Sequence, residues 1–355
     1  MKPSVQTAII GVTGYAGAEL ARLLLRHPRL KGVPPVLAGR LDEKDAARGG
    51  VPLVEIHPQL ADNNGAGSLR MESFSWNLLT ERGVDVLFLA TPHEQSRSWV
   101  PEALARGMRV IDLSGAWRLT NPAHRAVYKF EDANPALADA TQARAIYGMP
   151  ELYRQEIPTA DLVANPGCYA TSIILPLRPL VATGLVDLEA GIIADAKSGV
   201  SGAGKAPTAK THFMYAADNL SAYGVFGHRH TGELLEQIGL GDGDIVFTPH
   251  LLPIPRGILA TIYVRFRHAQ THAAVLDVYK KFFAASPLVR IYENSLPQIQ
   301  YSVRTCYADI GFQLSPDGKR AVIVSCLDNL LKGASSQAVQ NLNLMCGWGE
   351  AEGLE

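Results

Sequence analysis

Apolar and polar positions follow two patterns along the chain, and the first covers roughly residues 1–163. Here short apolar runs alternate with segments of helical periodicity. They predict helices over 18–27 and near 96–106, and buried strands over 7–12, 33–38, 84–90 and 108–113. Alternating strands and helices are typical of βαβ units, so this pattern predicts a parallel sheet. Residues 40–70 have weak periodicity and predict no defined element.

The second pattern begins near Cys168. Strands are predicted over 191–196, 245–249, 258–267 and 320–326, and helices over 169–177, 273–284 and 334–345. Strands in this mixture predict an α+β domain with a mixed or antiparallel sheet. The sequence therefore divides into an α/β domain over 1–163, an α+β domain over 164–327 and a C-terminal segment over 328–355.

Composition narrows the class of protein. The 355 residues suffice for two domains, and 47% hydrophobic with 19% charged residues fits sizeable cores. The net charge of -1 and the lack of a long basic run argue against nucleic acid or an anionic membrane as partner. The N-terminus lacks the apolar stretch of a signal peptide, and no window of eighteen apolar residues predicts a membrane span.

The cysteines point to a reducing compartment. Four of them are scattered along the chain, and none belongs to a Cys-x-x-Cys pair: Cys168, Cys306, Cys326 and Cys346. A disulfide framework or a zinc site is therefore not expected, and reduced thiols in the cytoplasm fit better.

A glycine-rich turn lies between the first predicted strand and the first predicted helix. Its spacing is Gly-x-x-Gly-x-x-Gly, a variant of the dinucleotide fingerprint, and its residues are Gly11, Thr13, Gly14, Tyr15, Ala16 and Gly17. Small residues let the backbone approach a pyrophosphate, whose charge the helix N-terminus favours. The turn predicts a nucleotide site, although a plain tight turn has the same composition.

The end of the second strand indicates which dinucleotide binds. NAD sites usually place Asp or Glu there to hold the ribose 2′-hydroxyl. This chain has Ala38-Gly39-Arg40, and Arg40 can pair with a 2′-phosphate, which favours NADP. The alternative is that Arg40 is a solvated surface residue and Asp42 is the acid.

The sequence Asn165-Pro-Gly-Cys168 places a cysteine between an apolar stretch and a helical run. Unpaired N–H groups and the dipole at a helix N-terminus favour negative charge, and a thiolate is the nucleophilic form of cysteine. Cys168 is thus a candidate nucleophile. A small buried cysteine after a tight turn is the alternative.

A second group of polar residues is Gly227-His228-Arg-His230-Thr231-Gly232-Glu. Thr231 is the predicted N-cap of a helix, so His230 would lie just ahead of it and could transfer a proton at neutral pH. The alternative is that both histidines lie on the surface without a catalytic role. A metal site is not predicted, because the sequence offers no convincing third ligand. Residues 198–205 form another glycine-rich loop, which is either a phosphate nest or a mobile loop.

Motifs along nearly the whole chain resemble the N-acetyl-γ-glutamyl-phosphate reductases of the aspartate-semialdehyde-dehydrogenase superfamily. In order, they are GVTGYAGAEL (11–20), DLSGAWRL (112–119), YGMPEL (147–152), NPGCYAT (165–171), KSGVSGAGK (197–205), GHRHTGEL (227–234), TPHLLPIPRGILATIY (248–263) and DNLLKGASSQAVQNLNLM (328–345). The chain departs from the family pattern at Trp117, Lys205, Gly232 and the Ala-Gly before Arg40.

The resemblance implies a Rossmann-type domain, an α+β catalytic domain and a C-terminal helix that packs back on the first domain. It implies NADPH as cofactor, Cys168 as nucleophile and His228 or His230 as acid/base. Ser198, Gly199 and Asn329 match segments near the nicotinamide. A homodimer or homotetramer without a metal is also implied.

The implied reaction reduces an N-acetyl-γ-glutamyl phosphate to its semialdehyde, for arginine biosynthesis, through a thioester. Its anionic substrate needs cationic partners, for which the candidates are Arg118, Lys205 and Arg256. The same chemistry on aspartyl phosphate or on a carrier-borne aminoadipyl phosphate is the near alternative. A non-enzymatic NADP-binding regulator is the distant one.

Overall fold

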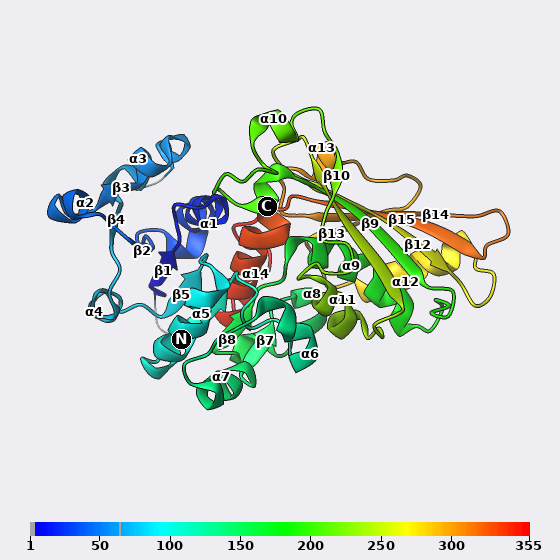
Figure 1. Ribbon diagram of the computed structural model, residues 1–355, viewed down its shortest axis with the longest axis horizontal. Coiled ribbons are helices and arrows are strands. Elements are labelled where there is room, and N and C mark those ends of the chain that lie inside the picture. Colours follow the sequence, from blue (N-terminus) through cyan, green and yellow to red (C-terminus); the bar gives the residue numbers. More distant parts are fainter. Residues whose placement is uncertain (1–3, 64) are drawn as a thin grey trace. The chain divides into compact units, whose positions relative to one another are not determined.

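The computed structural model describes residues 4–63 and 65–355 and divides the chain into two compact units (Figure 1). The first unit comprises Met1–Arg118, Lys129–Asn165 and Ala334–Glu355, and the second comprises Leu119–Tyr128 and Pro166–Gly333. The second unit thus contains a short segment, 119–128, that the sequence pattern assigned to the first domain.

The first unit is built on an eight-stranded sheet in the order β3-β4-β2-β1-β5-β6-β8-β7. Among the described residues its strands pair in parallel, except that β3 pairs antiparallel with β4. The strands are β1 (Thr7–Ile10), β2 (Val36–Gly39), β3 (Val51–Pro52), β4 (Arg70–Ser73), β5 (Val86–Leu89), β6 (Arg109–Asp112), β7 (Ala145–Tyr147) and β8 (Leu162–Ala164).

Helices accompany these strands. They are α1 (Tyr15–Arg26), α2 (Glu43–Ala47), α3 (Leu53–Ile56), α4 (Trp76–Glu81), α5 (His93–Ala105), α7 (Pro135–Gln142), α8 (Pro150–Tyr153) and α14 (Ser336–Met345). β1 and β5 are buried at every position, as is usual for strands covered on both faces. The predicted parallel α/β fold is confirmed, and the region 40–70 holds short elements that its weak periodicity did not reveal.

The C-terminal helix α14 belongs to the first unit and contacts α1 there. Buried amides make its polar contacts: Asn343 bonds to His27, and Asn341 bonds to Gly148 and Asn165. The first unit is therefore completed by the last stretch of the chain.

The second unit is a seven-stranded mixed sheet in the order β10-β11-β9-β12-β15-β14-β13. Its strands are β9 (Ile192–Gly199), β10 (Ser221–Ala222), β11 (Ile245–Leu252), β12 (Ile258–Arg265), β13 (Val289–Tyr292), β14 (Ala308–Leu314) and β15 (Arg320–Leu327). Its helices are α6 (Pro122–Arg125), α9 (Cys168–Ala182), α10 (Phe213–Ala216), α11 (Thr231–Ile238), α12 (His272–Phe282) and α13 (Ile299–Ser302).

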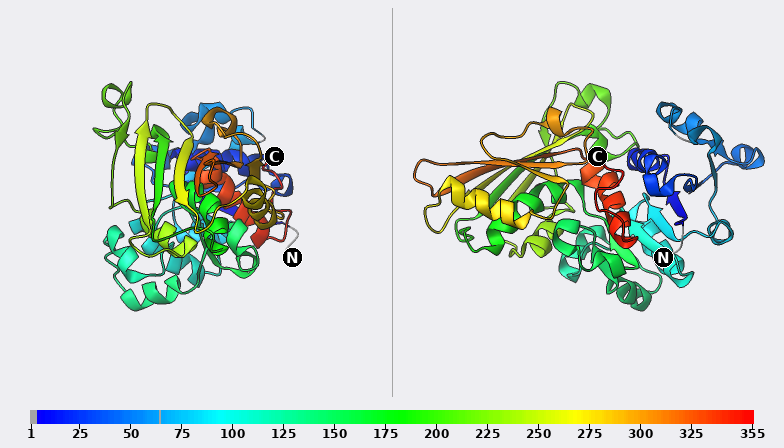
Figure 2. Two further views of the ribbon diagram at one scale, coloured as in Figure 1. Left: turned by 90° about the vertical axis from the view of Figure 1, so that its right-hand side faces the viewer. Right: turned by 180° about the vertical axis from the view of Figure 1, so that it is seen from behind.

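The strands β9, β11 and β12 alternate between buried and more exposed positions, which indicates one covered face. The helix α9 packs on that face, and α11 and α12 pack against α9 (Figure 2). The helix α9 continues through Pro176 and Pro179 to Ala182, beyond the predicted end at residue 177. Its burial from Tyr169 to Leu177 compensates for the backbone donors that the prolines lack.

Candidate active site

The glycine turn of the first unit joins β1 to α1. The helix begins at Tyr15 after Gly14, which makes no side-chain cap. Gly11 has φ +96°, and a Cβ there would lie 2.3 Å from the Ala90 carbonyl oxygen. A Cβ on Gly17 would lie 2.2 Å from the Gly11 carbonyl oxygen. Both positions require glycine because strand and helix approach so closely, and the open N–H groups of α1 remain available to an anion.

A cavity of about 560 Å³ opens beside this turn. It is lined by Ile10, Gly11, Thr13, Gly14, Gly39, Arg40, Leu41, Met71, Ser73, Phe74, Ala90, Thr91, Pro92, Gln95 and Trp99. Three residues of the predicted turn and the predicted Arg40 therefore share one cavity. Its aromatic wall comes from Phe74 and Trp99, whose ring centroids are 4.7 Å apart.

Asp42, the alternative acid for a ribose hydroxyl, has a different structural role. Its Oδ1 accepts a hydrogen bond of 2.7 Å from the Asp45 N–H and caps α2. Asp42 does not line the cavity, whereas Arg40 does. Of these two residues, the cavity therefore offers the cation Arg40, which can pair with a phosphate on the ribose.

In the second unit, Cys168 is the first residue of α9 and is half-buried. Gly167 precedes it in an extended conformation and provides no side-chain cap. The predicted placement of a thiol at a helix N-terminus is thus confirmed. Backbone N–H groups of that first turn lack intrahelical acceptors and favour a negatively charged sulfur.

His230 lies directly against the turn that holds Cys168. A Cβ on Gly167 would meet the His230 Nε2 at 2.4 Å, so only glycine lets the ring approach. Glu233 is fully buried, accepts a hydrogen bond of 3.0 Å from the Gly167 N–H and has its other oxygen 3.9 Å from His230 Nε2. One carboxylate thus contacts both the thiol's turn and the imidazole.

The predicted N-cap at Thr231 is wrong by one residue. Thr231 is already helical, and His230 is the cap, with φ −79° and ψ −8°. The cause is local: the Thr231 N–H donates to the His228 carbonyl, and the His230 N–H donates to the His228 Nδ1. These two bonds wind the chain into the helix one residue early.

His228 has surroundings that differ from those of His230. Its ring packs edge-to-face against Tyr169, Tyr223 and Phe247. Burial, with a smaller contribution from the neighbouring Arg229 charge, lowers the pKa of His228 from 6.5 to about 4. His228 is therefore neutral at physiological pH and accepts a backbone hydrogen bond.

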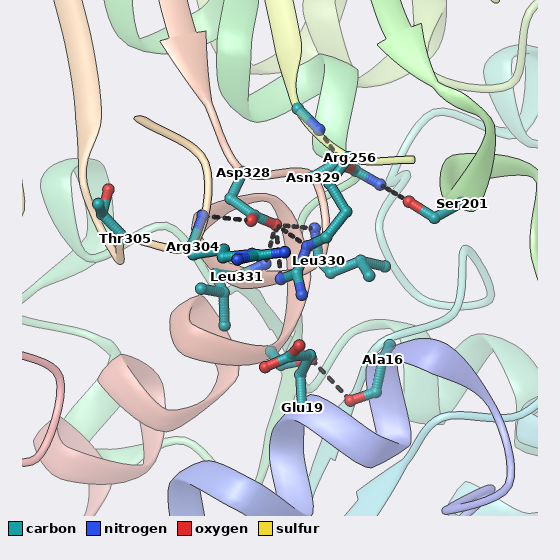
Figure 3. Close-up of polar contacts among 12 residues, drawn as sticks. Ala16, Glu19, Ser201, Arg256, Arg304, Thr305, Asp328, Asn329, Leu330 and Leu331 are labelled. Atoms are coloured by element: carbon teal, nitrogen blue, oxygen red, sulfur yellow. Dashed lines mark hydrogen bonds and ion pairs between the residues drawn. The ribbon is translucent and has the colours of Figure 1, made fainter. Parts of the chain in front are cut away.

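A buried carboxylate organises the opposite side of the thiol. Asp328 accepts hydrogen bonds from the Arg256 guanidinium and from the Arg304, Leu330 and Leu331 N–H groups (Figure 3). Its carbonyl accepts from Gly333, where a Cβ would lie 2.8 Å from the Cys168 Cβ. The bonds of Asp328 thus fix a turn that lies directly against Cys168.

Of the remaining predicted residues of the second unit, Asn329 follows Asp328 and Gly199 lies against Arg256, the partner of that carboxylate. Asn329 accepts from the Gly257 N–H and donates to Ser201. Ser198 is buried at the end of β9, and a Cβ on Gly199 would lie 2.7 Å from the Arg256 N. Lys205 lies on the exposed loop that follows.

Arg118 lies in the first unit. Its side chain is 7% exposed, and its guanidinium donates to the Leu113 and Asn165 carbonyl oxygens. These bonds give it a structural task, holding together two segments of the first unit.

The other cysteines differ from Cys168. Cys306 and Cys326 are buried, and burial raises the pKa of Cys326 to about 12 and that of Cys346 to about 11. Among the described residues, His, Cys, Asp and Glu side chains form no group of three that could hold a metal ion. In the same residues, no helix is long and apolar enough to cross a membrane.

Known proteins of one enzyme family are similar to this chain over nearly its whole length. Residues 6–160 match the model described as semialdehyde dehydrogenase, NAD binding domain, and residues 168–329 match the one described as its dimerisation domain. The N-acetyl-gamma-glutamyl-phosphate reductase of Desulfotalea psychrophila is 41% identical over 99% of this chain and 98% of its own. The protein of that name from Desulforudis audaxviator is also 41% identical, over the same shares.

The chain belongs to the N-acetyl-gamma-glutamyl-phosphate reductase family. Solved structures extend the likeness of fold. An aspartate semialdehyde dehydrogenase II from Vibrio cholerae has a TM-score of 0.69 at 17% identity, covering 97% of this chain and 98% of its own. A probable aspartate-semialdehyde dehydrogenase from Pseudomonas aeruginosa has a TM-score of 0.67 at 21% identity, over the same shares. The predicted fold and family membership are confirmed.

Sequence reasoning missed several residues of this reductase-family site. Glu233 had a visible signal, because it follows His230 by three residues in the first turn of a predicted helix. Asp328 and Gly333 belong to the family motif at 328–345, but nothing in the local sequence showed that Gly333 would lie against Cys168, because that contact depends on the return of the chain from β15. Met71, Ser73 and Phe74 lie in or next to the region of weak periodicity.

Proposed function

We propose that this protein uses NADPH to reduce N-acetyl-γ-glutamyl phosphate to N-acetylglutamate 5-semialdehyde, with release of phosphate, in cytoplasmic arginine biosynthesis. The observation that carries this proposal is the convergence of Cys168, His230 and Glu233 on the Gly167 turn. The names of relatives with about 40% identity support the substrate. The cavity with Arg40 supports the cofactor.

The thiolate of Cys168 attacks the acyl carbon, so that an S–C bond forms and the C–O bond to phosphate breaks. Reduced nicotinamide, when bound, supplies a hydride to the resulting thioester carbon. Protonated His230 donates its proton to the thiohemiacetal oxygen that hydride addition leaves. It takes this proton back as the carbonyl re-forms and the C–S bond breaks, which releases the aldehyde and returns the sulfur as thiolate. Backbone N–H groups at the start of α9 stabilise the negative charge on sulfur at both ends of this cycle.

His230, rather than His228, is the acid/base in this proposal. The His230 Nε2 lies against Gly167 and near Glu233, whereas the His228 Nδ1 already accepts from the His230 N–H. With a pKa lowered to about 4, His228 lacks a proton to give at neutral pH. His228 instead holds the backbone of His230 in place.

Glu233 is a positioning residue here. It bonds to the Gly167 N–H and faces His230, so it fixes the distance between imidazole and thiol turn and favours the imidazolium that forms during proton transfer. A carboxylate in this relation to a histidine stabilises charge without itself being protonated.

The first unit supplies the cofactor site of this proposal. Gly11, Thr13, Gly14 and the first helical residues Tyr15, Ala16 and Gly17 would hold the pyrophosphate through backbone N–H groups. Arg40 would hold the 2′-phosphate. The small residues of the turn, fixed by the contacts around Gly11 and Gly17, leave room for that approach.

Three cations remain proposed partners of the substrate's anionic groups, and their exposure and contacts support an order among them. Lys205 is exposed on its loop and Arg256 is partly exposed while paired with Asp328. Arg118 is buried and holds backbone carbonyls, so it ranks last. A guanidinium has five N–H donors, so an arginine that is paired with a carboxylate can also donate to a second anion.

A homodimer or homotetramer is part of the proposal. The uncovered face of the second sheet exposes Ile193, Val246 and Tyr263. Exposed apolar rows on a sheet are typical of association surfaces. The family model matched here is named for dimerisation, which supports the same conclusion.

The deciding experiment runs the reaction backwards. Purified protein is given N-acetylglutamate 5-semialdehyde, phosphate and NADP⁺, and NADPH is followed by absorbance. We expect reduction of NADP⁺ that requires phosphate, with aspartate 4-semialdehyde as a poor substitute. A preference for aspartate semialdehyde, or reduction without phosphate, would overturn the proposed function.

A further inference from the structure

The end of β2 and the end of β4 lie side by side at the rim of the cofactor cavity. Their register pairs Gly39 with Ser73, and the Phe74 N–H donates to the Gly39 carbonyl at 2.9 Å. Met71 and Ser73 of β4 line the cavity together with Gly39 and Arg40. The two strand ends therefore form one surface.

Met71 fills the space in which an acidic residue of a NAD site would project. A Cβ on Gly39 would lie 2.7 Å from the Met71 sulfur, and Met71 is only 5% exposed. An Asp or Glu at position 39, where NAD enzymes hold the ribose 2′-hydroxyl, would require this side chain to move.

Ser73 offers a hydroxyl at the same rim. It is exposed, and it lines the cavity beside Arg40. The neighbouring carboxylate of Glu72 is occupied by two hydrogen bonds from Arg82, at 2.8 and 3.0 Å. Asp42 is occupied as the cap of α2. The nearby acids are thus engaged elsewhere, which leaves a cation and a hydroxyl for a phosphate.

We infer that Met71 and Ser73 of β4 are specificity-determining residues for the dinucleotide: Ser73 binds the 2′-phosphate with Arg40, and Met71 excludes an acid at position 39. The inference rests on the proposed use of NADPH. Phe74 and Trp99, whose ring planes are tilted by 33°, line the cavity with Ser73 and provide an apolar surface for an adenine ring. Selectivity is then built on β4 as well as on β2.

Calorimetric titration of the full-length protein with NADP⁺ and with NAD⁺ tests this directly, because the two differ by one phosphate. Ser73→Ala is expected to raise the NADP⁺ Kd about tenfold, as for loss of a charge-assisted hydrogen bond, and to leave NAD⁺ binding within about twofold. Ser98→Ala, on the exposed side of α5, is the matched control and keeps both affinities.

A second pair of variants isolates Met71. Gly39→Asp alone is expected to weaken NADP⁺ binding without improving NAD⁺ binding, because Met71 obstructs the carboxylate. Gly39→Asp with Met71→Ala is expected to bind NAD⁺ about tenfold more tightly than Gly39→Asp alone. Thermal unfolding checks that the Met71 variant folds, and Ser73→Ala carries the test if it does not.

The outcomes distinguish failure of the inference about Met71 and Ser73 from failure of the proposed NADPH-dependent function. Wild-type protein that binds neither dinucleotide overturns the proposed function. Wild-type protein that prefers NADP⁺, with Ser73→Ala unchanged or equally weakened for both dinucleotides, overturns the role of Ser73. Gain of NAD⁺ binding by Gly39→Asp alone overturns the role of Met71.

Discussion

The helices α1 and α9 begin in the same way but have different proposed roles. The start of α1 is proposed to bind the dinucleotide, and the start of α9 carries the proposed nucleophile. Each follows a buried strand and a glycine, and neither has a side-chain cap. Side chains do cap other helices, namely α2, α4, α7 and α12, through Asp42, Ser75, Asn134 and Thr271. The starts of α1 and α9 thus lack a side-chain cap, a feature that suits an external anion or a thiolate.

The difference lies in what surrounds each start. At α1 the restrictions are backbone contacts: Gly11 against Ala90 and Gly17 against Gly11. At α9 they are side chains from elsewhere in the sequence, His230 and Glu233, together with Gly333. Holding a pyrophosphate needs only N–H groups in the right place, whereas covalent chemistry needs a nucleophile and a positioned proton carrier.

Replacing the proposed nucleophile should give the largest difference between the two helix starts, because it should lower turnover without affecting NADP⁺ binding. Cys168→Ser is expected to lower kcat at least ~100-fold, since a serine hydroxyl at this position is not ionised. NADP⁺ binding, which we propose at the start of α1, should stay within about twofold of wild type by calorimetry. Near-normal turnover in this variant would refute covalent catalysis.

Two matched alanine substitutions should separate the two helix starts. Gly17→Ala places a Cβ 2.2 Å from a backbone oxygen and should raise the NADP⁺ Kd at least ~10-fold. Gly167→Ala pushes His230 away from the thiol turn and should lower kcat at least ~10-fold while leaving that Kd unchanged.

Their controls are glycines with open surroundings. A Cβ on Gly67 in the first unit or on Gly243 in the second meets nothing within 4 Å, so alanine there should change neither quantity. If Gly17→Ala and Gly167→Ala damage binding and turnover alike, the functional division between the two helix starts is lost.

Glu233→Gln sharpens the account of α9. The amide oxygen can still accept from the Gly167 N–H, but the negative charge beside His230 is gone. We expect kcat to fall about tenfold with little change in KM, and the acidic limb of the pH–rate profile to move to lower pH. Glu233→Ala, which leaves the buried N–H of Gly167 without its acceptor, should fall further. Equal losses with an unmoved profile would make Glu233 a purely structural residue.

The smallest expected effect concerns His228. Because the folded protein lowers its pKa from 6.5 to about 4, the unfolded chain binds a proton in this window that the folded chain does not. Stability from this group is complete above pH 6.5 and declines as the pH falls toward 4. His228→Asn should therefore make the free energy of unfolding about 2 kcal/mol less sensitive to acidification between pH 7 and 5. Urea midpoints at the two pH values measure it; His27, whose pKa is also lowered by burial, remains as background in both proteins.

Local sequence predicted what depends on local sterics. The glycine spacing from Gly11 to Gly17 and the turn before Cys168 each announced a strand, a tight turn and a helix, and the structure contains all three parts. The parallel sheet followed from buried apolar runs such as that of β5. These signals survive in one sequence because each is contained within about ten residues.

Contacts between distant residues left no such signal. Segment 119–128 joins the second unit because Glu236 on α11 accepts from the Thr120 and Asn121 N–H groups and contacts His124. Polar contacts of this kind leave no hydrophobic periodicity in the sequence. The cofactor rim on β4 was missed for a related reason, since its strand is four residues long and half exposed.

The amides of α14 have a consequence for synthesis of the chain. Buried groups near Glu151, Gly148 and His27 find their partners on Gln340, Asn341 and Asn343. During synthesis from the N-terminus, most of the first unit is made before the second unit. Its helix α14 is made only after the second unit. Truncation before α14 would leave these buried groups of the first unit without their partners, and quality-control proteases degrade incompletely folded chains.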